Sequence, residues 1–136
     1  MKLPGTATPG FISADDVQQS RVHPSMDGKQ VFKNAVNRLL ETAGALLQRN
    51  KISSEEIDLV IPHQANLRIN EMVRAQLGLP SEKVFNNIQK YGNTTAATIP
   101  ICMSEAVAEG RLKEGSLVMT LAFGAGFTWG GNLIRW

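Results

Sequence analysis

Three helices are predicted from the spacing of apolar positions and from their end signals. Apolar residues recur at steps of three and four across residues 30–47, which predicts an amphipathic helix with Asp27 as its cap. A second helix is predicted over residues 66–77, because the capping residue Asn66 opens it and Gly78 follows as a C-terminal glycine. A third is predicted from residues 93–95 toward residue 110, and Pro100 inside it marks a kink or a late start.

Short apolar runs between these helices predict strands at residues 57–61, 84–88 and 116–123. A turn at residues 124–126 leads into a returning strand at 127–136, and Ser53 with Glu56 has the spacing of a capping box before the first strand. Alternation of helix and strand favours right-handed crossovers. We therefore predict the α/β class, with a mainly parallel sheet that ends in an antiparallel hairpin.

The first 25 residues differ from the rest of the chain. They hold three of the six prolines and two glycines, and they show no sustained periodicity. We interpret residues 1–25 as an extended linker or loop segment and residues 26–136 as one domain. His23 is interpreted as a solvated loop histidine.

Composition narrows the class of protein. With 43% hydrophobic and 19% charged residues, the 136-residue chain has a globular composition. Its net charge of +2 is scattered, which gives little support to nucleic-acid binding. One cysteine excludes an internal disulfide and a cysteine-rich zinc site, and no metal site is predicted. Without a membrane span or the apolar core of a signal peptide, a cytoplasmic protein is expected.

Each of the strands predicted at residues 57–61, 84–88 and 116–123 is followed by residues that can donate hydrogen bonds. They are His63, Asn93 and the turn Gly124-Ala125-Gly126. Because ligands bind beyond the carboxyl ends of parallel strands, we expect these loops to open on one face of the sheet. Two neutral donors at a common point would suit an oxygen that becomes negatively charged, and the turn would offer backbone N–H groups to a second one.

Each of these features also has an ordinary structural interpretation. His63 fits a buried structural histidine, Asn93 fits a helix cap, and the glycine turn fits a plain hairpin. Cys102 is interpreted as a buried, unactivated thiol. The pairs Glu55-Glu56 and Asp15-Asp16 are interpreted as solvated turns and caps. No credible nucleophile or strong base accompanies the donors, so the residues alone indicate an incomplete acyl-transfer site.

Three strings carry a resemblance to a known family: PHQANLRI at residues 62–69, YGNTTAATIP at 91–100 and AFGAGFTWGG at 122–131. In this order and spacing they resemble the C-terminal half of β-ketoacyl-acyl carrier protein (ACP) synthase III, a thiolase-fold condensing enzyme. The resemblance covers roughly residues 26–136. It implies one of the two similar α/β halves that together form a five-layered αβαβα body.

The resemblance also implies roles for individual residues. His63 and Asn93 match the histidine and asparagine of the family's Cys–His–Asn set, and Gly124 and Ala125 fall in the loop that donates to the oxyanion. The family often has glycine where Ala125 stands, but a backbone amide survives that change. The nucleophilic cysteine belongs to the N-terminal half, and Cys102 does not match it. The chain alone is therefore predicted to be inactive.

The implied reaction starts fatty acid synthesis. An acyl group passes from acyl-CoA to the cysteine, and malonyl-ACP then loses carbon dioxide and condenses with it; no cofactor is bound covalently. The implied partners are the N-terminal half, upstream or on a separate chain, the acyl carrier protein, and a second complete synthase in a dimer.

Further matched positions concern substrate binding. Arg68 matches a basic position that meets the carrier protein or the phosphates of coenzyme A, or it is a solvated helix arginine. Asn66 matches a pantetheine-contacting position, or it caps its helix. Met26 and Phe32 match positions near the acyl or pantetheine tunnel, or they are core residues.

Two other functions stay open from the sequence. In the first alternative, the chain is a non-catalytic partner subunit of a ketosynthase pair, although such a scaffold would not need both His63 and Asn93. Alternatively, it would belong to an acyltransferase that passes the acyl group to an amine or an alcohol.

Overall fold

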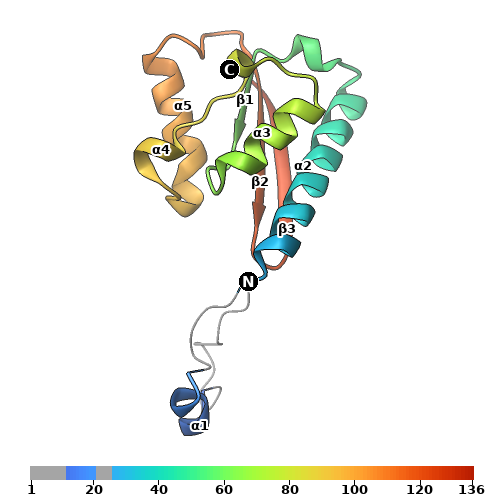
Figure 1. Cartoon of the computed structure of the whole chain (residues 1–136). Coiled ribbons are helices and arrows are strands. Elements are labelled where there is room, and N and C mark those ends of the chain that lie inside the picture. Colours follow the sequence, from blue (N-terminus) through green and yellow to red (C-terminus); the bar gives the residue numbers. More distant parts are fainter. Residues whose placement is uncertain (1–11, 21–25) are drawn as a thin grey trace. The chain divides into compact units, whose positions relative to one another are not determined.

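The computed structural model describes residues 12–20 and 26–136 (Figure 1). The chain divides into two compact units, Met1–Lys33 and Asn34–Trp136. Helix α1 (Ala14–Gln18) lies in the first unit, and α2 (Gly28–Asn50) begins there and continues into the second. The second unit holds the remaining elements, which are β1 (Leu59–Pro62), α3 (Leu67–Gln76), α4 (Ile88–Tyr91), α5 (Thr98–Ala108), β2 (Leu117–Gly124) and β3 (Thr128–Arg135).

The strands form one mixed sheet in the order β1-β2-β3. Strands β1 and β2 are parallel, with Leu59 opposite Val118 and Pro62 opposite Leu121. Strands β2 and β3 are antiparallel and joined by the short turn that follows Gly124. The α/β class and the terminal hairpin are therefore confirmed.

The strand predicted at residues 84–88 is wrong. Its sheet contact is limited to an isolated parallel bridge between Val84 and Val60, with a hydrogen bond from Phe85 N to Val60 O of 2.9 Å. The next two backbone N–H groups, of Asn87 and Ile88, bind a side chain instead of a neighbouring strand. The parallel part of the sheet is consequently smaller than predicted.

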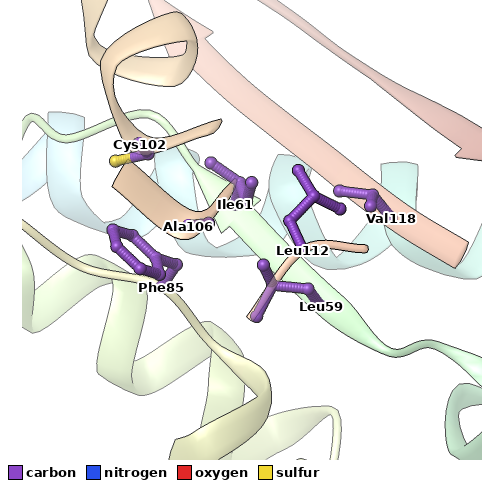
Figure 2. Packing of buried hydrophobic residues seen from close by; sticks show 7 residues of the cluster. All are labelled: Leu59, Ile61, Phe85, Cys102, Ala106, Leu112 and Val118. Carbon is purple, nitrogen blue, oxygen red and sulfur yellow. The ribbon is translucent and has the colours of Figure 1, made fainter. Parts of the chain in front are cut away.

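A cluster of buried apolar side chains covers one face of the sheet (Figure 2). It draws on β1, β2, α5 and the segments beside α4 and α5, and its members are Leu59, Ile61, Phe85, Cys102, Ala106, Leu112 and Val118. Leu59 and Val118 share this face because they are register partners, and Ile61 shares it because side chains alternate along a strand. Helix α5 is thus packed on this face by its apolar side.

Helix α2 packs on the opposite face, where β3 carries a glycine. Gly131 pairs with Leu121, which lies an odd number of residues from the β2 member of the cluster and so faces the other way. A Cβ at Gly131 would lie 2.6 Å from a backbone oxygen of β2 and 3.0 Å from Thr42 Cγ2 of α2. The Arg38 guanidinium of α2 lies 4.6 Å from the centre of the Trp129 ring. Glycine at position 131 therefore allows the helix to approach the sheet closely.

The three predicted long helices are confirmed, with shifted ends. Asp27 Oδ1 accepts a hydrogen bond from Gln30 N at 3.0 Å, as expected of a cap for α2. Gly78 has a φ of +67°, which favours glycine just after α3. Helix α5 starts late, at Thr98, so Pro100 lies in its first turn. Backbone N–H groups of the first turn have no partner within the helix, so the missing N–H of proline costs no helical hydrogen bond there. The capping residue Ser53 also precedes a 3-10 turn, as predicted.

The interpretation of residues 1–25 as an extended linker or loop is wrong for Ala14–Gln18, which form α1. Ser13 N donates to Asp16 Oδ2 at 2.9 Å and Asp16 N donates to Ser13 Oγ at 3.1 Å, a capping box that starts this short helix. The interpretation of Asp15-Asp16 as cap residues is confirmed, and Asp15 is exposed while Asp16 is half-buried. The domain boundary after residue 25 stays a prediction, and His23 lies outside the described residues.

Candidate active site

His63 stands directly after β1, at the edge of the sheet where parallel β1 and β2 both end. Its backbone N donates to Leu121 O at 2.7 Å, which continues the β1–β2 ladder by one bond. Its Nδ1 lies 2.5 Å from the hydroxyl oxygen of Thr98 at the start of α5. Partial burial lowers the pKa of His63 below the usual 6.5, so the ring is neutral near pH 7.

Asn93 is exposed in the segment between α4 and a 3-10 turn at Thr95–Ala97. Its Oδ1 accepts a hydrogen bond from Thr95 N at 2.9 Å, an Asx-type turn over two residues. Thr95 has a φ of +52°, which is uncommon for a β-branched residue. Because this turn uses the amide oxygen, Asn93 keeps its Nδ2 hydrogens as donors. The cap-like contact and a donor role are therefore compatible.

A chain of hydrogen bonds joins the His63 loop to the Asn93 loop. His63 Nδ1 contacts Thr98 Oγ1, and that hydroxyl also lies 3.1 Å from Thr95 O. Thr95 N in turn binds the side chain of Asn93. The structure thus brings together the two loops in which the sequence predicted the principal site residues.

Gln64 is a residue of this site that the sequence analysis missed. It is completely buried, and its Nε2 donates to Pro62 O at 2.7 Å. Its Oε1 accepts from Asn87 N at 3.1 Å and from Ile88 N at 3.2 Å. One side chain therefore fastens the His63 loop to the beginning of α4, which leads to Asn93. Its place in the string PHQAN was the available signal, but nothing in the sequence alone showed its burial.

Glu105 of α5 holds the other end of α4. Its carboxylate accepts from Tyr91 Oη at 2.5 Å and Asn87 Nδ2 at 2.8 Å, and it pairs with Lys90. These contacts, led by Lys90, lower the pKa of Glu105 from 4.5 to about 2. Tyr91 lies two residues before Asn93, so this cluster anchors the approach to the site.

Cys102 is a buried structural residue, as predicted. Its thiol donates to Asn87 Oδ1 at 3.0 Å, and burial is the main cause that raises its pKa to about 11. A thiol with such a pKa is almost entirely protonated near pH 7 and is a poor nucleophile.

Gly124 and Ala125 lie at the same edge of the sheet as His63. Leu121 of β2 lies beside His63, to which it is hydrogen-bonded. Gly124 follows three residues later on β2, which is about 10 Å along the strand at a rise of about 3.3 Å per residue. Both turn residues are exposed, and Ala125 O accepts from Thr128 Oγ1 at 3.1 Å. The turn is also an ordinary hairpin connection, and a donor role for its amides stays a prediction.

The four residues predicted to bind substrate are placed as follows. Asn66 caps α3, because its Oδ1 accepts from Arg68 N at 2.9 Å. Arg68 is exposed in the first turn of that helix. Met26 is exposed and Phe32 is half-buried, and both belong to the unit Met1–Lys33. Their contacts with carrier protein, coenzyme or acyl chain stay predictions.

Two features are absent from residues 12–20 and 26–136. Within those ranges, no group of three or more His, Cys, Asp and Glu side chains is arranged to hold a metal ion. None of the helices described there is both long and apolar enough to cross a bilayer.

The fold of the chain is that of a thiolase-like domain, as in solved structures of 3-oxoacyl-[acyl-carrier-protein] synthase III. Residues 47–136 match the family described as 3-oxoacyl-[acyl-carrier-protein (ACP)] synthase III C terminal. The chain therefore belongs to this family.

Individual relatives agree with this assignment. The β-ketoacyl-[acyl-carrier-protein] synthase III of Chlorobium phaeobacteroides is 43% identical over the whole chain, which covers 41% of that protein. The one from Campylobacter jejuni is 53% identical over 81% of the chain and 34% of that protein. The solved structure of the Aquifex aeolicus 3-oxoacyl-[acyl-carrier-protein] synthase III aligns with a TM-score of 0.82 and 46% identity, covering 85% of this chain and 38% of that one. The chain thus spans about two fifths of the length of the curated relatives it matches.

Proposed function

We propose that this chain supplies the histidine and asparagine of a β-ketoacyl-ACP synthase III active site. A separate half of the protein would supply the nucleophilic cysteine. The observation that carries the proposal is the hydrogen-bond chain from His63 through Thr98 and Thr95 to Asn93. It ties together the two loops that hold the family's matching residues.

In the first stage, the cysteine thiolate attacks the carbonyl carbon of an acyl-CoA. The thioester bond to coenzyme A breaks, coenzyme A leaves as the thiolate, and the acyl group stays on the cysteine. Backbone amides at Gly124 and Ala125 would donate to the oxyanion of the tetrahedral intermediate. Both residues are exposed at the carboxyl end of β2, which supports access for a thioester.

In the second stage, malonyl-ACP loses carbon dioxide, and the electron pair of the broken C–C bond forms an enolate. The enolate carbon attacks the acyl-cysteine carbonyl, and the cysteine leaves as the C–C bond of the product is completed. His63 and Asn93 Nδ2 would donate to the thioester oxygen while it gains charge. The lowered pKa of His63 supports a neutral donor. Each such donor is typically worth about 10²–10³ in rate.

The same proposal assigns the substrates and partners. Acyl-CoA and malonyl-ACP are the substrates, without a bound cofactor, and the complete synthase acts as a cytoplasmic dimer. Arg68, exposed on α3, would meet the acidic carrier protein or the coenzyme's phosphates. Asn66 would contact pantetheine through its Nδ2, since its Oδ1 caps the helix. Met26 and Phe32 would line the tunnel.

The experiment that tests this function combines the chain with a cysteine-bearing half from a synthase III. Assembled wild-type protein should form β-ketoacyl-ACP from acyl-CoA and malonyl-ACP, and the 136-residue chain alone should not. His63→Ala and Asn93→Ala should each lower kcat for condensation about 10²–10³-fold while the cysteine is still acylated. His23→Ala, at the chain's other histidine, is the matched control.

Two results would contradict the proposal. One is turnover by the chain with no second polypeptide present. The other is unchanged condensation by the His63→Ala assembly, which would instead indicate a non-catalytic subunit. No contact among the described residues favours that alternative or an amine or alcohol acceptor, and the curated relatives reported above carry the synthase III name.

A further inference from the structure

The hydroxyl of Thr98 is in contact with the imidazole of His63 and is shielded from water. Thr98 Oγ1 and His63 Nδ1 lie 2.5 Å apart, which is within hydrogen-bond reach. Thr98 is 2% exposed, so solvent does not compete for this contact. Thr98 is the first residue of α5, so the helix holds its backbone in place.

A hydroxyl has one hydrogen, and two acceptors lie near that of Thr98. One is the lone pair of His63 Nδ1, and the other is Thr95 O at 3.1 Å. If the hydrogen goes to Thr95, the hydroxyl only accepts from the ring, and the neutral ring carries its hydrogen on Nδ1. If it goes to the ring, Nδ1 is the acceptor and the hydrogen of the neutral ring lies on Nε2.

We propose that Thr98 is a positioning residue that donates its hydroxyl hydrogen to His63 Nδ1 and thereby keeps the ring hydrogen on Nε2. The close contact places the Thr98 hydroxyl within reach of Nδ1, and only this direction of donation leaves the hydrogen of the neutral ring on Nε2, where the proposed function needs it. The neutral state of the half-buried ring agrees with it, because an imidazolium would need to donate from Nδ1 as well.

The consequence concerns the proposed function, on which this inference rests for its catalytic meaning. A neutral His63 stabilises a developing oxyanion only from a nitrogen that carries a hydrogen. With Nδ1 occupied by Thr98, that nitrogen is Nε2. Thr98 would therefore decide whether the ring faces the substrate oxygen as a donor or as an acceptor, without touching the substrate itself.

Nitrogen NMR of the isotope-labelled imidazoles tests the direction of the bond. The assembled protein is used, with this chain alone labelled and carrying His23→Gln, so that His63 is the one labelled histidine. We expect Nδ1 to show the shift of an unprotonated acceptor, Nε2 to be protonated, and the Thr98 hydroxyl proton to correlate with Nδ1. A hydrogen on Nδ1, or a missing hydroxyl correlation, overturns the inference whether or not any variant folds.

Kinetics of the assembled synthase provide a second measurement. Thr98→Val keeps the side-chain shape but removes the hydroxyl, and kcat for condensation should fall about tenfold, as expected for one hydrogen bond. The KM for malonyl-ACP and the acylation of the cysteine should not change. Thr98→Ser, which restores the hydroxyl, should recover most of kcat. Equal activity of the Val and wild-type proteins, or failure of Ser to recover kcat when Val loses it, would refute the inference.

The two measurements separate this inference from the proposed function. If the assembled wild-type protein makes no β-ketoacyl product, the proposed function fails, while the NMR experiment still decides the position of the hydrogen. If condensation proceeds but the ring hydrogen lies on Nδ1, the proposed function stands and the role of Thr98 is wrong.

Discussion

Gln64→Met should destabilise the protein by about 2–4 kcal/mol. Methionine has a similar length but offers neither a strong donor nor a strong acceptor. Pro62 O loses the 2.7 Å bond from Nε2, and Asn87 N loses its 3.1 Å bond to Oε1. Both residues are buried, and we take about 1–2 kcal/mol for each group left without this partner, the lower part of the usual range of about 1–3 kcal/mol. Another partner, Ile88 N, belongs to a half-buried residue, so water compensates part of its loss; Nε2 also makes two longer contacts of 3.4 Å, to Phe85 O and Asn86 Oδ1.

Urea denaturation measures this free energy of unfolding. A loss of about 2–4 kcal/mol is a large share of the roughly 5–15 kcal/mol by which a domain is stable, so the midpoint should shift clearly. Gln76→Met is the matched control, because Gln76 is exposed on α3 and the chemical change is the same. Its effect should stay within about 0.5 kcal/mol.

A second readout concerns the loops. Because Gln64 joins the residue after His63 to the start of α4, the Met variant should also lower kcat of an assembled synthase at temperatures where it remains folded. The reasoning is refuted if the Gln64 and Gln76 variants unfold at the same urea concentration. That result would mean that water or a shifted backbone replaces the hydrogen bonds of Gln64 without loss.

Two further perturbations test the sheet and the acidic cluster. Gly131→Ala should destabilise by about 1–3 kcal/mol, because its Cβ would overlap the β2 backbone, whereas Gly130→Ala meets nothing within 4 Å; equal melting temperatures for the two would contradict this. The pKa of Glu105, lowered by Lys90 and its other partners from 4.5 to about 2, means that its stabilising contribution is complete above pH 4.5 and is lost as the pH falls toward 2. Glu105→Gln should flatten acid denaturation over that range, whereas Glu109→Gln, exposed at the end of α5, should not; a parallel acid limb for wild type and Glu105→Gln would exclude this role.

Most of the fold could be predicted because the signals are local. The stripe over residues 30–47 and the caps Asp27 and Asn66 act within one turn of their helices, and all are confirmed. The prediction failed where a side chain distant in sequence overrides local propensity. Residues 84–88 resemble a strand, but the amide of Gln64 captures two of their N–H groups, and α4 begins instead.

Of the candidate site, the sequence predicted the residues proposed to act on the substrate but not the residue that positions them. His63 and Asn93 follow recognisable strand-end and turn positions, and the loops that bear them do meet. Thr98 could not be identified as a site residue from the sequence, because nothing in the local pattern distinguishes it from the neighbouring threonines. Its contact with His63 spans 35 residues and depends on where α5 begins. Positioning residues are harder to find because their function lies in a partner that the local pattern does not contain.

Gln64, Thr98 and Glu105 together hold the two site loops in place. Gln64 holds the start of α4, Glu105 holds its end, and Thr98 connects the next helix to His63. Every one of these contacts lies inside the unit Asn34–Trp136. The geometry around His63 and Asn93 therefore rests on contacts within this unit, which in the proposed synthase the cysteine-bearing half would meet. What that half would add is the nucleophile, so an assembled synthase would gain its reactive group at a site whose donors are already arranged.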